Sequence, residues 1–191
     1  GPCREICALT GASMQTVTRL CKLGLLEQQE REVLRSPKQE PPPPAEPITL
    51  TDEQQTAFDG LSAQMEREKP GAALLYGVTG SGKTAVYVAL IQKALDEGRS
   101  AMLLVPEIAL TPQLLGRMTA HFGKTVAVLH SSLRVGERYD EWRRIARGEA
   151  RVVVGTRSAV FAPLQSPGLL ILDEEQEHTY KSENAPRYHA R

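Results

Sequence analysis

The chain has 191 residues and a formal net charge of zero, because 23 basic side chains balance 23 acidic ones. This length fits one α/β domain with a small appendage, and the neutral balance gives no global sign of a nucleic-acid partner. No apolar stretch approaches the roughly 20 residues of a membrane helix, so we expect no membrane partner and a cytoplasmic protein. Cys3, Cys7 and Cys21 lack zinc-ligand spacing, and we expect buried, reduced thiols.

Residues 1–36 have the outline of the second half of a winged-helix module. Ser13 is suited to cap a short amphipathic helix that Gly24 ends, and two short strands are expected within residues 25–34. Such a helix lies against DNA or a partner protein, or simply packs against a neighbouring part of the protein. The sequence leaves these alternatives open.

A proline-rich segment, residues 37–47, separates this module from residues 48–191. Its prolines propagate neither helix nor central strand, so we expect a stiff extended linker. A helix follows over residues 50–68, with Thr51 as its N-cap. Gln54 either completes a capping box or hydrogen-bonds the adenine edge of a nucleotide, and the sequence favours neither role.

The most informative motif is Gly-Val-Thr-Gly-Ser-Gly-Lys-Thr at residues 77–84, between a predicted strand (72–76) and a predicted helix (83–96). Strand, glycine-rich loop and helix in this order predict a P-loop that binds a nucleoside triphosphate. Lys83 is expected to reach the β- and γ-phosphates, and the Thr84 hydroxyl to hold Mg²⁺. The ATP-binding residues predicted in the loop are Gly77, Val78, Thr79, Gly80, Ser81, Gly82, Lys83 and Thr84.

Further strands and helices alternate along the rest of the chain. Strands are predicted at 101–105, 125–129, 151–155 and 168–172, and helices at about 111–122 and 134–147. Apolar strands separated by helices predict an α/β fold, in which helices cover both faces of a parallel sheet. Ligands of such sheets bind at the carboxyl ends of the strands.

An acidic pair, Asp173 and Glu174, directly follows the last predicted strand. Asp173 is expected to hold Mg²⁺, and Glu174 to act as the general base that polarises the attacking water. With Lys83, they form the predicted catalytic set. An acidic pair at a strand end is typical of motor-type nucleotide hydrolases.

Loops at the other strand ends carry small hydroxyls and backbone amides, which suit phosphodiester binding. A later loop interleaves aromatic and basic residues, which suits stacking on single-stranded DNA, although a plain exposed polar loop has the same composition. The predicted DNA-binding residues are Pro106, Thr111, Thr156, Arg157, Ser158, Tyr180, Lys181, Arg187 and Tyr188.

The ordered set of motifs resembles the bacterial primosomal protein N′ family of replication-restart helicases, densely over residues 48–191 and more loosely over 13–37. The resemblance rests on 77–84 together with four further segments, at 105–113, 129–132, 155–163 and 186–191. It implies the first RecA-like lobe of a superfamily 2, 3′-to-5′ DNA helicase that uses ATP and Mg²⁺. Forked and single-stranded DNA, primosome proteins and single-stranded-DNA-binding protein are the implied partners.

Two departures from this family qualify the resemblance. Gln176 stands where the family has histidine in its Asp-Glu-Glu-His motif, so coupling between hydrolysis and movement is expected to differ. The chain also reads as a fragment without the family's second lobe, arginine finger and zinc-binding cysteines, so we expect zinc only outside it and weak activity from the chain alone. A P-loop phosphotransferase and a non-catalytic DNA- or partner-binding adaptor are the alternative functions.

Overall fold

The computed structural model describes residues 3–27, 45, 47–67, 69–78, 80–182 and 187–190, without the side chains of residues 4–6. The chain divides into two compact units, Gly1–Leu34 and Arg35–Arg191. Within the described residues, no helix has both the length and the apolar character that a membrane crossing requires.

The first unit contains two helices, α1 (Cys3–Thr10) and α2 (Met14–Lys22). The predicted cap is confirmed, because the backbone N–H of Thr16 donates to the Ser13 Oγ at 3.2 Å. Helix α1 has no counterpart among the sequence predictions. Residues 25–27 form no strand, and the remainder of the expected strands (28–34) lies outside the described residues. The winged-helix assignment therefore stays a prediction.

The three cysteines of this unit are free and half-buried, so the expectation of fully buried thiols was wrong. Two short helices enclose too little volume to cover three thiols completely. The predicted linker at 37–47 lies outside the described residues, apart from Ala45 and Pro47.

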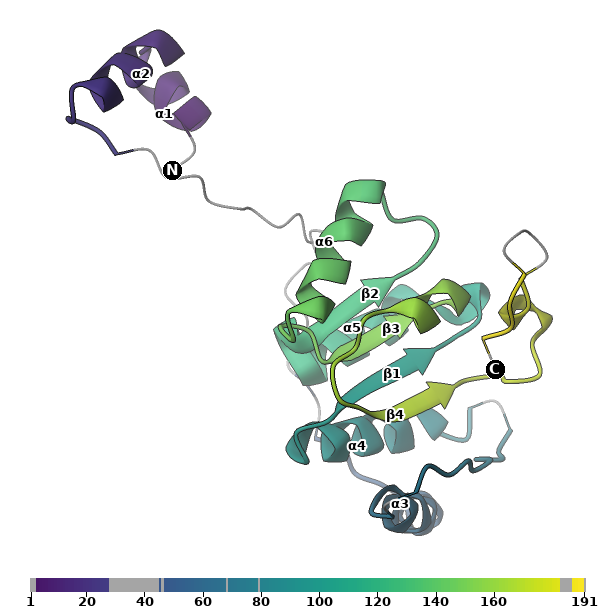
Figure 1. Cartoon of the computed structure of the whole chain (residues 1–191). Coiled ribbons are helices and arrows are strands. Elements are labelled where there is room, and N and C mark those ends of the chain that lie inside the picture. Colours follow the sequence, from purple (N-terminus) through teal and green to yellow (C-terminus); the bar gives the residue numbers. More distant parts are fainter. Residues whose placement is uncertain are drawn as a thin grey trace. The chain divides into compact units, whose positions relative to one another are not determined.

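The described residues of the second unit build a four-stranded parallel sheet in the order β2-β3-β1-β4 (Figure 1). Four strand predictions are confirmed to within a residue or two. The strands are β1 (Ser100–Leu104), β2 (Val126–Leu129), β3 (Val152–Gly155) and β4 (Pro167–Leu172). Because all four run in the same direction, their carboxyl ends meet at one edge of the sheet.

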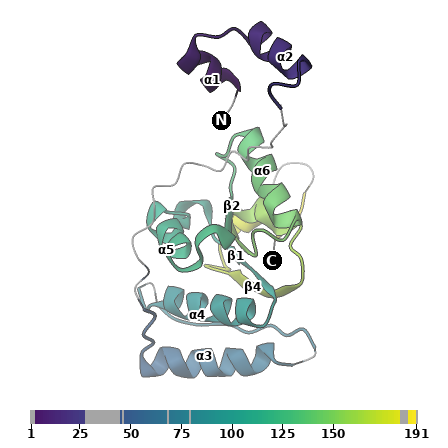
Figure 2. The ribbon, with the colours of Figure 1, turned by 90° about the vertical axis from the view of Figure 1, so that its left-hand side faces the viewer.

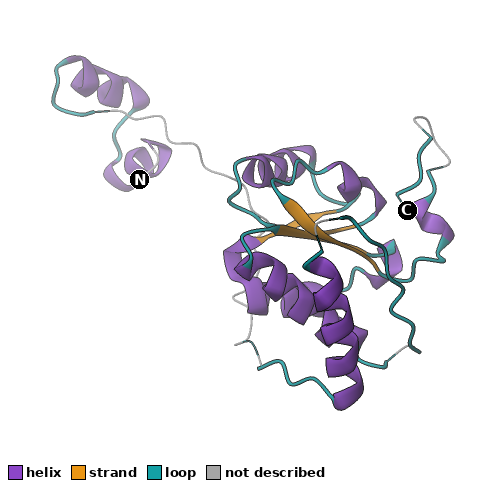
Figure 3. Cartoon of the chain, turned by 60° about the horizontal axis from the view of Figure 1, so that its bottom comes forward, coloured by secondary structure: helices purple, strands orange, loops and turns teal. Residues whose placement is uncertain are grey.

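Helices cover both faces of this sheet, which confirms the predicted α/β fold (Figure 3). Alternate residues of each strand point to opposite faces. Ala101 and Leu103 of β1 therefore join one apolar cluster, whereas Met102 and Leu104 join the other. The first cluster includes α4 (Lys83–Asp96) and α5 (Pro112–Phe122), and the second includes α6 (Val135–Ala146).

The strand predicted at 72–76 is absent from the structure, where this segment has no regular secondary structure. Leu74 and Tyr76 of this segment are 74% and 90% exposed. Leu170, on β4 at the edge of the sheet, is 52% exposed. A strand is stable only when its backbone groups pair with a neighbour. In the described part of the chain, 72–76 pairs with no strand, so its apolar character alone does not make it one.

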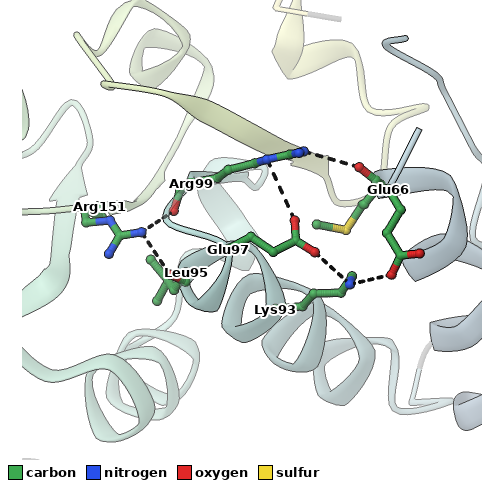
Figure 4. A network of polar contacts seen from close by, with 7 residues as sticks. Glu66, Lys93, Leu95, Glu97, Arg99 and Arg151 are labelled. Atoms are coloured by element: carbon green, nitrogen blue, oxygen red, sulfur yellow. Dashed lines mark hydrogen bonds and ion pairs between the residues drawn. The ribbon is translucent and has the colours of Figure 1, made fainter. Parts of the chain in front are cut away.

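Helix α3 (Asp52–Met65) packs next to α4, and it ends three residues earlier than predicted (Figures 1 and 2). Charged residues fix its last turn against α4 (Figure 4). Lys93 contacts Glu66 at 2.9 Å and Glu97 at 2.7 Å, and the Glu97 hydrogen bond, followed by that of Glu66, raises the pKa of Lys93. Such surface pairs add little stability, and of the two only Lys93–Glu66 joins α4 to the end of α3.

Candidate nucleotide-binding site

The glycine-rich loop leads directly into the first turn of α4. Gly80 and Gly82 have φ values of +84° and +80°, a left-handed conformation that favours glycine. Gly82 is the N-cap of α4 and provides no side-chain cap. The first backbone N–H groups of a helix lack partners within the helix, so they form a suitable site for an anion. Of the predicted loop residues, Thr79 lies outside the described residues.

Lys83 folds back over the loop that precedes it. Its Nζ donates to the Gly77 carbonyl oxygen at 2.7 Å and contacts the Val78 carbonyl oxygen at 3.4 Å. A phosphate oxygen is a stronger acceptor for an ammonium group than a neutral carbonyl is. The observed position therefore keeps Lys83 at the loop, with its donors available for exchange to a phosphate.

Gln54 connects α3 to this loop. Its Oε1 accepts from the Thr51 N–H at 3.0 Å, and the Gln54 N–H donates to the Thr51 Oγ1 at 3.3 Å. The capping box is therefore confirmed. The amide Nε2 also donates to the Ser81 carbonyl oxygen at 3.2 Å, and a Cβ at Gly82 would lie only 2.3 Å from this nitrogen. Adenine recognition by Gln54 stays a prediction.

Asp173 lies at the carboxyl end of β4, where its N–H donates to the Leu104 carbonyl oxygen at 2.9 Å. The Tyr87 hydroxyl donates to the Asp173 Oδ1 at 2.9 Å. Burial, and next the charge of Asp173, raise the pKa of Tyr87 above its ordinary value. Because Tyr87 lies one turn after Lys83 on α4, the contact brings the helix of the glycine-rich loop to the strand-end carboxylate.

Glu174 adopts a left-handed backbone conformation, with φ +48°. For a non-glycine residue this costs about 1–3 kcal/mol, and such strain is concentrated at functional sites. Gln176 donates its Nε2 to the Glu174 Oε2 at 2.7 Å. The residue that departs from the motif thus contacts the predicted general base directly.

The oxygen donors near the loop fit Mg²⁺. Among the described residues, no three His, Cys, Asp or Glu side chains gather into a metal-binding group. Mg²⁺ commonly binds through one carboxylate, a hydroxyl, waters and the phosphates of the nucleotide. The Asp173 carboxylate and the Thr84 hydroxyl, both half-buried, have the right chemistry for this mode.

The predicted DNA-binding residues lie at or near the strand ends but differ in exposure. Pro106 and Thr156 are buried, and Thr111 caps α5 through a hydrogen bond from the Leu114 N–H at 3.2 Å. Both Ser158 and Lys181 are exposed. Arg187 and Thr111 are exposed as well, and only the exposed members are available to a phosphodiester in this conformation.

Arg157 binds the C-terminal segment of the described chain. Its Nη1 donates to the carbonyl oxygens of Thr179, at 3.1 Å, and Lys181, at 2.5 Å. Its guanidinium also lies 5.6 Å from the centre of the Tyr188 ring. That ring packs edge-on against Phe161, with centroids 4.8 Å apart. Arg157 and Tyr188 thus stabilise each other here, which the sequence did not reveal.

Tyr180 does not fit its predicted role in base stacking, because its ring is fully buried. The hydroxyl lies 2.6 Å from the Asp173 carbonyl oxygen and 3.0 Å from that of Leu104. Burial raises the pKa of this hydroxyl, as does the nearby Asp173. Tyr180 therefore links the aromatic-rich segment to the backbone of the candidate metal ligand.

Sequence reasoning missed Tyr87, although its position four residues after Lys83 was a signal for it.

Comparison with known families agrees with this geometry. The DEAD/DEAH box helicase family matches residues 51–190, most of the second unit. The chain belongs to this helicase family.

Individual relatives of the chain are named replication restart protein PriA. The Bacillus subtilis protein is 48% identical over 191 residues, which is 100% of this chain and 24% of the relative. The Synechocystis protein is 44% identical over 180 residues, covering 94% of this chain and 21% of the relative. The Treponema pallidum protein is 49% identical over 144 residues, or 74% of this chain and 21% of the relative. The chain thus spans about a quarter or less of their length.

Proposed function

We propose that the chain carries the ATP-binding lobe of a 3′-to-5′ replication-restart DNA helicase of superfamily 2. The observation that carries this proposal is the 2.9 Å hydrogen bond from Tyr87 to Asp173, which joins the helix after the glycine-rich loop to the strand-end carboxylate. The family match and the names of the relatives support the DNA-helicase reading over a phosphotransferase or an adaptor.

In the proposed site, backbone N–H groups of residues 77–84 bind the phosphates of ATP, and Lys83 exchanges its loop carbonyls for the β- and γ-phosphates. Asp173 and Thr84 hold Mg²⁺, which supplies charge neutralisation at the transferring phosphoryl group when it is bound. Glu174 orients and polarises the attacking water. Gln176 restrains the Glu174 carboxylate from one side.

DNA is proposed to cross the carboxyl ends of the strands. The exposed side chains of Thr111, Ser158, Lys181 and Arg187 are the candidates for phosphate contact. Tyr188 is half-buried and packed on Phe161, so stacking on a base requires it to leave that contact. Residues 1–36 are proposed as part of a winged-helix module, and 37–47 as its linker to the lobe.

Proposals about the whole protein go beyond this chain. We propose that the whole protein restarts replication at forked DNA in the cytoplasm. Its proposed partners are primosome proteins and single-stranded-DNA-binding protein. Because the chain spans 24% of the Bacillus relative, we propose that residues outside it supply further contacts to the transferring phosphoryl group. Hydrolysis by the chain alone is then slow, although it binds ATP.

Nucleotide binding and hydrolysis test this function in two steps. Wild-type chain should bind a fluorescent ATP analogue in the presence of Mg²⁺, and Lys83→Ala should weaken binding at least tenfold, since it loses a charge-assisted contact of about 1.5–3 kcal/mol. Lys124→Ala is the control, because it removes an exposed lysine just before β2, at the amino ends of the parallel strands and away from their carboxyl ends. Hydrolysis by the full-length protein should then rise with forked DNA. Equal binding by wild type and Lys83→Ala would refute the nucleotide site.

A further inference from the structure

We propose that Tyr87 is a positioning residue for Mg²⁺, one that holds the Asp173 carboxylate in the orientation that binds the metal. This inference rests on the proposed function, and it deepens that function by assigning a role to a side chain outside the glycine-rich loop and the acidic pair. The contact behind it is the 2.9 Å hydrogen bond from the Tyr87 hydroxyl to the Asp173 Oδ1.

The direction of this hydrogen bond follows from chemistry. An ionised carboxylate only accepts hydrogen bonds, so the hydroxyl of Tyr87 must be the donor. One lone pair of Oδ1 is then used by Tyr87, whereas no hydrogen bond from Tyr87 reaches Oδ2, which stays open to the metal or its bound water. A carboxylate with one oxygen fixed loses much of the rotational freedom that metal binding would otherwise have to restrict.

The Tyr87 ring is rigid enough to impose that orientation. It is 7% exposed and belongs to the apolar cluster that also contains Val88 and Ile91 of α4. A packed aromatic ring presents its hydroxyl from a nearly fixed point. Lys83 lies one turn earlier on the same side of α4. One helix thus carries both the lysine proposed for phosphate and the hydroxyl that orients the metal ligand.

The backbone of Asp173 is held separately from its side chain. Its N–H donates to the Leu104 carbonyl oxygen at 2.9 Å, and its own carbonyl oxygen accepts from the Tyr180 hydroxyl at 2.6 Å. These contacts fix where the residue lies, whereas Tyr87 fixes how its carboxylate is turned. Partners of this outer kind typically change metal affinity 10- to 100-fold when they are removed.

The test is a Mg²⁺ titration of the 191-residue chain in the presence of a non-hydrolysable fluorescent ATP analogue. Tyr87→Phe should raise the half-saturating Mg²⁺ concentration about tenfold. Binding of the analogue without metal should be unchanged, because Tyr87 is not proposed to touch the nucleotide. Tyr139→Phe, which removes the hydroxyl of an exposed tyrosine on α6, should bind Mg²⁺ as the wild type does.

A half-saturating concentration that is unchanged or lower in Tyr87→Phe would overturn the inference while leaving the proposed function intact. Absence of Mg²⁺-dependent binding by the wild type would instead overturn the proposed function, and this inference with it. A second readout keeps the hydroxyl at position 87. With fluorotyrosine incorporated, the Tyr87 fluorine resonance should shift when Mg²⁺ joins the nucleotide-bound chain, and a constant resonance would refute the role.

Discussion

Removing the Tyr180 hydroxyl tests whether this side chain stabilises the end of β4. In Tyr180→Phe the ring remains in its buried position, and only the donor to the Asp173 and Leu104 carbonyl oxygens is lost. The Leu104 oxygen still accepts from the Asp173 N–H, so mainly the Asp173 oxygen loses a partner. An unsatisfied buried acceptor costs about 1–3 kcal/mol. Because the contact to the Asp173 oxygen is only partly buried, we expect a loss at the lower end, about 1 kcal/mol in the free energy of unfolding.

Urea unfolding followed by fluorescence measures this loss. Trp142 is the single tryptophan of the chain, and it packs against the same apolar cluster that contains Tyr180. Its emission therefore reports the second unit and not the first. The urea midpoint should fall with an unchanged slope, and the melting temperature should drop by about 2–4 °C per kcal/mol.

Tyr139→Phe is again the matched control, since Tyr139 is 61% exposed and surface substitutions usually change stability by less than about 0.5 kcal/mol. Equal midpoints for wild type and Tyr180→Phe would contradict the assigned hydrogen bonds. An equal loss in Tyr180→Phe and Tyr139→Phe would show that removing any tyrosine hydroxyl has this effect, and it would refute the reasoning as well.

Three further outcomes follow from the site and its surroundings. Gly155→Ala should lower the free energy of unfolding by about 1–3 kcal/mol in urea, because the added Cβ would lie 2.4 Å from the Leu129 carbonyl oxygen. Gly116→Ala is the control. A Cβ at Gly116 would meet nothing within 4 Å, so this variant should not destabilise the chain. Gln176→Ala frees the Glu174 carboxylate, so ATP turnover of the full-length protein should fall several-fold with unchanged ATP binding; equal turnover refutes this. The two buried tyrosines have raised pKa values, so only the unfolded state releases their protons near pH 10. The contribution of these two tyrosines to stability should be constant below that pH. Above it, their contribution should fall by about 1.4 kcal/mol per pH unit and tyrosine, and each Phe variant should reduce this slope in alkaline urea titrations.

Local sequence signals determined much of this protein. The apolar strand β1, the caps Ser13 and Thr51 and the turn glycines of the nucleotide loop act within a few residues of one another, so their patterns predicted structure directly. The acidic pair after β4 was predictable for the same reason. A strand end and its following turn are contiguous in the chain.

Only the tertiary structure decided which side chains meet. Tyr87 and Asp173 are 86 residues apart, and no local pattern pairs them. Tyr180 belongs to a composition that suits DNA stacking, yet its ring is buried because the chain folds back over β1 and β4. The segment 72–76 shows the reverse case, since its apolar residues predicted a strand that pairs with none in the described part of the chain. Pairing, burial and hydrogen bonding between distant segments depend on the whole fold, whereas caps and turns depend on their neighbours.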